Sequence, residues 1–198
     1  MKKTIETPNS SWAFQIDKTH NWAFMNNVFS PEECKKIIEI GESKLLKKAK
    51  INNTNVLSDI RNSEISWLYS VDDMDWAFRR VTEAINHLNN NFFNFDLFGF
   101  VEGFQFTKYK GPSGFYGMHM DKMFDGTIRK LSLTIELSDP KSFKGGDLVL
   151  QVGKVPDVIE KQQGKLVAFP SYILHEVKPV TKGTRYSLVS WITGNPYK

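Results

Sequence analysis

A histidine and an aspartate stand two positions apart in the apolar stretch FYGMHMDKMFDG, residues 115–126. On a β-strand, His119 and Asp121 would project from the same face, because successive side chains alternate between the two faces. An imidazole nitrogen and a carboxylate oxygen are two of the three ligands of the 2-His-1-carboxylate arrangement, which leaves positions of an octahedral Fe(II) open. The His-x-Asp motif alone is weak evidence, because it occurs by chance in many proteins.

The chain offers a second histidine for such a site. His175 lies on a predicted strand 54 residues after Asp121, and Arg185 follows ten residues later on another predicted strand. An arginine that points into a β-barrel is costly unless an anion meets it, and a dicarboxylate would supply a bidentate partner. An outward-facing strand arginine is the alternative. His20 and His87 lie on a polar segment and a helix surface, without comparable neighbours.

Two helices are predicted ahead of these strands. Ser30, Pro31 and Glu33 supply an N-cap, a proline at the first helical position and a capping box. A second helix is predicted over about residues 72–91, where apolar residues recur at helical spacing and a run of asparagines marks the end. Residues 1–20 are polar and are predicted to form an N-terminal extension.

From residue 97 onward the sequence changes to short β-type runs. FGFVEGFQFTKY, RKLSLTIELS and TRYSLVSWI alternate polar and apolar residues, and glycine, proline or aspartate separates the runs. Regular short strands without a helical pattern between them predict an antiparallel barrel or sandwich, with helices over one face of a sheet. We therefore predict an α+β, mainly β fold, with a single domain over residues 21–198 and a β core at about 97–194.

Composition sets the limits of these hypotheses. Forty per cent of the 198 residues are hydrophobic and 13% are aromatic, which is ample for a folded core. The net charge is 26 − 22 = +4, a mild basic excess that identifies no partner. The single cysteine, Cys34, excludes an intrachain disulfide and a Cys-based zinc site. Because no apolar leader and no apolar run of about 18 residues is present, we expect a cytoplasmic protein without membrane partners.

The chain resembles the Fe(II)/2-oxoglutarate-dependent dioxygenases, specifically their prolyl 4-hydroxylase-like branch, from about Val28 to Trp191. The segments that carry the resemblance, in the family's order and spacing, are NNVFSPEECKKII, QFTKYKGPSGFYGMHMD, RKLSLTIELSDPKSFKGGDLVL and GKLVAFPSYILHEVKPVTKGTRYSLVSWITG. The resemblance implies a double-stranded β-helix, or jelly roll, with the N-terminal helices packed on one sheet.

The resemblance also implies a role for five residues. His119, Asp121 and His175 match the family's iron ligands. Arg185 matches the basic residue that pairs with the C5 carboxylate of 2-oxoglutarate, and Tyr109 matches a hydrogen-bond donor to this cosubstrate. Relatives of the collagen type often carry a lysine where Arg185 stands, so this site resembles the bacterial and oxygen-sensing relatives more closely.

Five other residues have a less specific assignment. Leu131, Thr134 and Trp191 fall on strands that line the family's pocket, and plain core packing is an equal alternative for each. Tyr116 could face either the substrate or the core. A buried carboxylate beside an anionic cosubstrate would be costly, so we expect Glu136 to face outward or to pair with a cation.

The methionines around the motif receive two different predictions. Met118 and Met120 alternate with His119 and Asp121, so we expect them to point to the opposite face and to pack in the core. Met123 and Phe124, just beyond the motif, are candidates for the substrate rim.

The resemblance implies a hydroxylase that uses Fe(II), 2-oxoglutarate and O₂, and it allows for ascorbate as a reductant. The first hypothesis is hydroxylation of a prolyl or other residue of a protein or peptide, by analogy alone. The alternatives are hydroxylation of a free amino acid or other small metabolite and, less favoured, oxidative demethylation of nucleic acid. A non-catalytic cupin-like binding module is a hypothesis of a different class. The sequence leaves the oligomeric state open.

Overall fold

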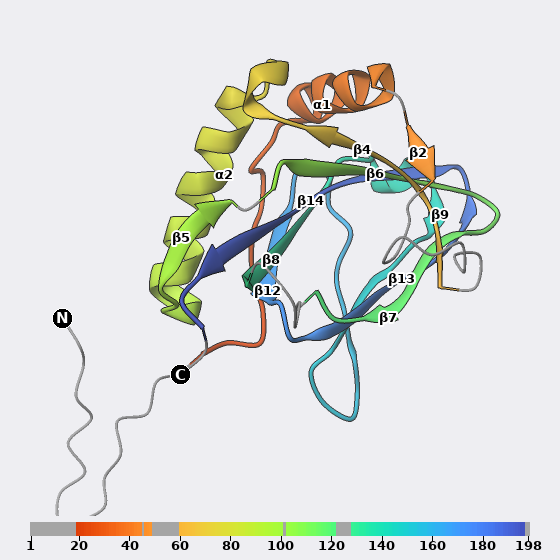
Figure 1. Ribbon diagram of the computed structural model, residues 1–198. Coiled ribbons are helices and arrows are strands. Elements are labelled where there is room, and N and C mark those ends of the chain that lie inside the picture. Colours follow the sequence, from red (N-terminus) through yellow and green to blue (C-terminus); the bar gives the residue numbers. More distant parts are fainter. Residues whose placement is uncertain (1–18, 45, 49–59, 101, 122–127, 197–198) are drawn as a thin grey trace, which may run out of the picture.

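The computed structural model describes residues 19–44, 46–48, 60–100, 102–121 and 128–196. Over these residues the chain forms two antiparallel sheets, with two α-helices packed against one of them (Figure 1). The predicted N-terminal extension lies almost entirely outside the described residues. Its last residue, His20, is tied to the body by a hydrogen bond from its backbone N–H to the Phe92 carbonyl at 2.9 Å.

The two sheets contain eight and six strands among the described residues. In spatial order, the larger sheet is β1 (Ala23–Met25), β12 (Leu166–Pro170), β8 (Arg129–Glu136), β14 (Thr184–Gly194), β6 (Phe104–Lys110), β4 (Glu64–Leu68) and β2 (Lys47–Lys48), with β5 (Leu97–Phe100) also paired to β14. The smaller sheet is β11 (Asp157–Val158), β10 (Leu148–Gln151), β13 (Leu174–Lys182), β7 (Gly114–His119) and β3 (Arg61–Asn62), with β9 (Lys144–Gly145) also paired to β13. The mainly β organisation predicted from the sequence is thus confirmed.

The first helix, α1 (Pro31–Ser43), begins where its capping signals predict. The Ser30 hydroxyl accepts a hydrogen bond from the Glu33 N–H at 3.2 Å. In return, the Glu33 carboxylate accepts one from the Ser30 N–H at 2.9 Å. The capping box therefore satisfies two backbone donors that the helix itself leaves unpaired.

The second predicted helix is confirmed with shifted ends. The α-helix α2 covers Asp75–Leu88 and continues as a π-helical turn, Asn89–Phe93. The chain leaves this turn because the side-chain amide of Asn89 donates to the Phe95 carbonyl at 2.8 Å and accepts from the Phe95 N–H at 3.0 Å. The remaining described helices are the short 3-10 turns Ser70–Asp72 and Pro140–Ser142. No helix in the described part of the chain is both long and apolar enough to cross a membrane.

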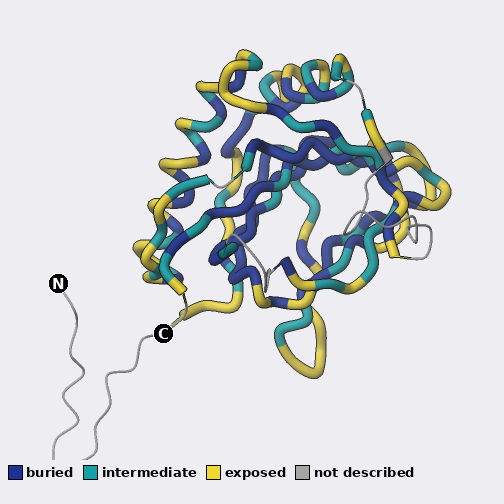
Figure 2. The backbone as a smooth tube through the Cα atoms, in the orientation of Figure 1, coloured by how far each residue is buried: buried dark blue, intermediate teal, exposed yellow. Residues whose placement is uncertain are grey.

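The larger sheet is buried on both faces, as the dark strands at the centre of Figure 2 show. On its outer face, Leu133 of β8 shares a core with Ile37 of α1 and Val81 of α2. On its inner face, Val167 of β12 shares a second core with Leu150 of the smaller sheet. Because strand side chains alternate, β12 and β6 contribute to both cores, whereas β8 and β14 contribute only to the helix-side core. The candidate site lies on the inner side.

A glycine allows α1 to approach the sheet closely. A Cβ atom at Gly41 would lie 2.5 Å from the ring of Phe106 on β6, well inside van der Waals contact. The hydroxyl of Ser66 on β4 also donates to the Gly41 carbonyl at 3.0 Å. The absence of a side chain at Gly41 therefore sets the distance between helix and sheet.

The cap of α1 makes a measurable contribution to stability. We expect Ser30→Ala to lower the free energy of unfolding by about 1 kcal/mol, because a backbone donor loses its acceptor. Urea denaturation followed by circular dichroism measures this difference. Ser43→Ala, at the exposed far end of the same helix, is the matched control and should stay within about 0.5 kcal/mol of the parent. Equal unfolding free energies for the two variants would contradict the role of the cap.

Candidate metal centre

Three side chains with metal-binding groups converge on the inner side of the sheets. His119 is the last residue of β7, and its Cα partner on β13 is His175. Asp121 lies just beyond β7, with its carboxylate oxygens 3.6 Å from Nε2 of His119 and 3.4 Å from Nε2 of His175. One ligand atom from each residue lies within 4.8 Å of the other two. The three residues can therefore bind a single ion, although the strand ends before Asp121.

Backbone carbonyls orient both imidazoles in the same way. Nδ1 of His119 lies 2.8 Å from the carbonyl oxygen of Gly117, and Nδ1 of His175 lies 2.9 Å from that of Ile173. Since a carbonyl only accepts, each Nδ1 carries the proton and donates it. This arrangement assigns the tautomer and leaves both Nε2 lone pairs free for a metal.

The larger sheet holds the third ligand. The hydroxyl of Ser132 on β8 donates to Oδ2 of Asp121 at 2.7 Å, and it also lies 2.9 Å from the Ser171 hydroxyl. The backbone N–H of Asp121 donates to the Ser171 carbonyl at 3.1 Å. These bonds fix a carboxylate that is only 8% exposed. The larger sheet therefore places Asp121 against the histidines of the smaller sheet.

Burial and neighbouring charges set the protonation of the three groups. Burial, followed by the charge of His175, lowers the pKa of His119 to about 4. Burial opposes ionisation of Asp121, but His175 and His119 outweigh it and hold the pKa of this carboxyl well below its usual range. Burial also disfavours a charged His175, but the charge and hydrogen bond of Asp121 raise its pKa. At neutral pH Asp121 is thus ionised and His119 is neutral, which are the forms that bind metals.

The donor set fits Fe(II). Two imidazole nitrogens and one carboxylate are the ligands of the non-haem Fe(II) oxygenases and leave coordination positions open for other ligands. Among the described residues, no other group of three histidine, cysteine or acidic side chains meets in this way.

The structure adds a charged neighbour that the sequence analysis missed. The ring of Tyr116 stacks on His119 with 3.6 Å between centroids, and the guanidinium of Arg61 lies 4.4 Å from the Tyr116 ring. Arg61 is buried and donates to Ser63 at 2.7 Å and to Gln105 at 2.9 Å. No carboxylate among the described residues pairs with it. The sequence around Arg61 gave no signal for this position, because the contacts with Gln105 and Tyr116 join distant segments.

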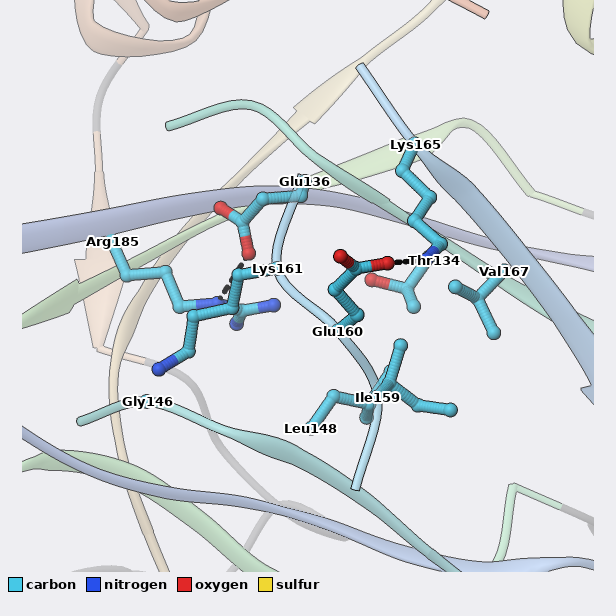
Figure 3. A pocket seen from close by; sticks show the side chains of 10 residues that line it. All are labelled: Thr134, Glu136, Gly146, Leu148, Ile159, Glu160, Lys161, Lys165, Val167 and Arg185. Atoms are coloured by element: carbon cyan, nitrogen blue, oxygen red, sulfur yellow. Dashed lines mark hydrogen bonds and ion pairs between the residues drawn. The ribbon is translucent and has the colours of Figure 1, made fainter. Parts of the chain in front are cut away.

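Arg185 points from β14 into a pocket lined by residues of both sheets (Figure 3). Its Nε donates to a carboxylate oxygen of Glu136 at 2.8 Å, and both side chains are buried. Thr134 also lines this pocket. Ser132, which binds Asp121, lies two residues before Thr134 on the same face of β8. The pocket and the candidate metal centre therefore share one inner surface.

Of the other predicted pocket residues, Tyr109 and Trp191 lie on the same side of the sheet as Arg185, and Leu131 lies on the opposite side. Tyr109 is buried, is the Cα partner of Arg185, and has its ring 5.5 Å from the guanidinium carbon. Trp191 lies on the same face of β14 as Arg185 and is also buried. The pocket assignment of Leu131 is wrong, because residues three apart on a strand face opposite sides. With Thr134 facing inward, Leu131 packs in the helix-side core.

The Gly-Gly turn before β10 leaves room for the arginine. Gly146 has φ = +67°, and a Cβ atom there would lie 3.0 Å from Cδ of Arg185. A side chain at this position would therefore be strained and would press on Arg185.

The prediction for the methionines is wrong in one respect. Met118 is 41% exposed and Met120 is 44% exposed, so neither packs in the core. Their side chains project away from the ligands, but that face of β7 and of the residues following it is open to solvent. Met123 and Phe124 lie outside the described residues.

Residues 104–193 match the model of the 2OG-Fe(II) oxygenase superfamily. Among curated proteins, a PKHD-type hydroxylase of Prochlorococcus marinus is 43% identical over 94 residues, which is 46% of this chain and 42% of that protein. A PKHD-type hydroxylase of Idiomarina loihiensis is 37% identical over 79 residues, 39% of this chain and 36% of that protein. The matched region thus spans less than half the length of these relatives.

Solved structures extend the likeness over most of the described fold. A prolyl-4-hydroxylase from Pseudomonas putida superposes with a TM-score of 0.72 at 22% identity, covering 89% of this chain and 94% of that one. A prolyl hydroxylase from Trichoplax adhaerens, in complex with a peptide fragment of hypoxia inducible factor, gives 0.73 at 20% identity, covering 88% and 84%. At these identities the likeness concerns the fold, and the predicted double-stranded β-helix is confirmed.

The hydrogen bond from Ser132 to Asp121 should strengthen metal binding. We expect Ser132→Ala to weaken Mn(II) binding by roughly tenfold or more, because the ligand carboxylate loses its orienting donor. Calorimetry on the metal-free protein measures this change. Ser190→Ala is the matched control, because Ser190 is also buried, lies on the helix-side face of β14 and has no hydrogen-bond partner. An unchanged affinity in Ser132→Ala would show that the bond does not position the ligand.

Proposed function

We propose that this chain is an Fe(II)- and 2-oxoglutarate-dependent hydroxylase, because its residues 104–193 match the model of the 2OG-Fe(II) oxygenase superfamily. The observation that carries this proposal is the convergence of His119, Asp121 and His175, with both Nε2 atoms free and the carboxylate ionised. Such a site has three protein ligands and open positions, which is the requirement for binding a chelating cosubstrate and O₂ at one ion.

Different residues would bind the metal and the cosubstrate. His119, Asp121 and His175 would hold Fe(II), and Arg185 would bind the distal carboxylate of 2-oxoglutarate. The inward residues Ser132, Thr134 and Glu136 succeed one another along β8 at about 7 Å intervals, so this surface leads from the metal ligands to the arginine. When bound, Fe(II) supplies the oxidising chemistry: a C–H bond, O₂ and 2-oxoglutarate give a hydroxyl group, succinate and CO₂. Buried Tyr109 and Trp191 help to keep water from this region.

We propose a protein or peptide as the substrate, with a prolyl residue as the first candidate. The related structure from Trichoplax adhaerens holds a peptide, which supports this class. Arg61 supports it as well, because a buried guanidinium beside Tyr116 and the metal ligands, without a carboxylate partner among the described residues, is available to a substrate carbonyl. A free amino acid or small metabolite is the second candidate, since a carboxylate would also satisfy Arg61. The cytoplasmic compartment stays a prediction from the sequence.

Loss of a metal ligand should abolish the reaction. We expect His119→Ala and Asp121→Ala each to reduce substrate-dependent succinate formation below detection, because the ion loses one of three protein ligands. Coupled assay of succinate measures this. His87→Ala, an exposed histidine on α2, is the matched control and should keep full turnover. Full turnover in both ligand variants would contradict the assignment of the site.

Arg61 should act on the substrate and not on the cosubstrate. We expect Arg61→Ala to raise the KM for a proline-rich peptide substrate by about tenfold, the equivalent of one hydrogen-bonded charge. Substrate-free decarboxylation of 2-oxoglutarate should stay unchanged. Arg79→Ala, an exposed arginine of α2, is the control.

The candidate substrates would first be compared by mass. Hydroxylated peptides and free amino acids gain one oxygen atom, whereas a demethylated oligonucleotide loses one CH2 unit as formaldehyde. A mass change in methylated oligonucleotides alone would contradict the peptide proposal.

A further inference from the structure

Glu136 makes an ion pair with the very arginine that the proposed function assigns to 2-oxoglutarate. Oε2 of Glu136 accepts from Nε of Arg185 at 2.8 Å, and Figure 3 shows the two groups facing each other at one end of the pocket. Glu136 is 8% exposed and Arg185 is 3% exposed. The pair is thus removed from water. In this low-dielectric environment each charge interacts strongly with its neighbours.

The pair leaves one edge of the guanidinium unused. Oε1 of Glu136 accepts from the backbone N–H of Ser138 at 3.2 Å, so both carboxylate oxygens are fixed. Nη1 of Arg185, in contrast, is buried and has no hydrogen-bond partner. An unpaired donor on a buried cation is costly and calls for an acceptor. Glu136 therefore holds Arg185 by the Nε edge and leaves a donor for a ligand.

The remaining charges of the pocket already have partners. Lys161 pairs with Asp147 at 2.6 Å, and Lys165 pairs with Glu160 at 3.2 Å. Those two carboxylates are 41% and 80% exposed, so water screens them. Of the three carboxylates Glu136, Asp147 and Glu160, Glu136 is the buried one. A ligand carboxylate on Arg185 would add an unbalanced negative charge next to it.

We propose that Glu136 positions Arg185 for the cosubstrate and takes up one proton when the distal carboxylate of 2-oxoglutarate binds. The proton comes from solvent and neutralises the Glu136 carboxylate, whose negative charge the ligand carboxylate disfavours. A protonated carboxyl still accepts from Nε through its carbonyl oxygen, so Arg185 stays in place. This inference rests on the proposed function, because it takes 2-oxoglutarate as the ligand.

The surroundings of Glu136 favour this protonation. Burial raises the pKa of Glu136, and the charge of Arg185 opposes the rise. Arg185, Lys161 and the Ser138 N–H favour its charged form, and its own charge acts on the Tyr109 hydroxyl and the Cys34 thiol. Burial raises the pKa of Tyr109 and, to about 12, that of Cys34, so both stay neutral. A second carboxylate bound to Arg185 would weaken the effect by which the arginine lowers the pKa of Glu136, so this pKa would rise further.

The sign of the pH dependence follows by linkage. A ligand that raises the pKa of a group binds most tightly where that group is protonated, and its affinity falls as pH rises. The dissociation constant of 2-oxoglutarate should therefore increase with pH, by up to about tenfold per pH unit over the steepest part of the curve. Calorimetry on Mn(II)-loaded protein measures it. Two buffers of different ionisation enthalpy give the protons taken up per ligand.

Two variants separate positioning from charge. Glu136→Gln keeps an oxygen acceptor for Nε but cannot titrate, so its dissociation constant should vary much less with pH and its proton uptake should fall by about one per ligand at the steepest point. Glu136→Ala frees Arg185, so it should bind 2-oxoglutarate about tenfold or more weakly than Glu136→Gln at every pH. Glu160→Gln makes the same substitution at an exposed carboxylate of the pocket and should keep the pH dependence of the parent.

The outcomes are distinguishable. Parallel pH dependence in the parent and Glu136→Gln, or equal affinities for the alanine and glutamine variants, would overturn this inference alone. Failure of the metal-loaded parent to bind 2-oxoglutarate at any pH would overturn the proposed function and this inference with it.

Discussion

The burial of the Asp121 carboxylate is the constraint on which the rest of the site depends. A buried carboxylate is tolerated only when hydrogen bonds and opposite charges surround it. Here those groups come from both sheets: Ser132 of the larger sheet donates to Oδ2, and His175 of the smaller sheet lies 3.4 Å away. Any shift of one sheet over the other would leave the charge unsatisfied. The relative position of the two sheets therefore determines the geometry of the site.

The parts of the fold with local causes could be predicted from the sequence. The start of α1 needs only Ser30, Pro31 and Glu33, which lie within four residues. The three candidate ligands could be proposed because residue type and order, together with the family resemblance, restrict the choice among four histidines. The error at Leu131 had a different origin. Its face depends on which residues of β8 point inward, and the sequence Leu-Ser-Leu-Thr places polar residues, not leucines, on the functional side.

Contacts between distant segments could not be predicted in the same way. Arg61 reaches Gln105, 44 residues away, and stacks over Tyr116 on another strand; nothing in the sequence around Arg61 announces either contact. Glu136 was expected to face outward or to pair with a cation, and the cation is Arg185 itself. That pairing follows from the register of β8 and β14, in which Glu136 lies opposite Ser187, two residues from the arginine on the same face. Register is set by the whole sheet.

The bonds that orient the two histidines have an evolutionary consequence. Each imidazole is oriented by the carbonyl two residues earlier in the chain, Gly117 for His119 and Ile173 for His175. The hydrogen bonds that orient them are thus encoded in two tripeptides, residues 117–119 and 173–175. Exchange of peripheral segments would leave these two bonds intact, so chains of this fold could acquire new targets while they keep the same orientation of both histidines.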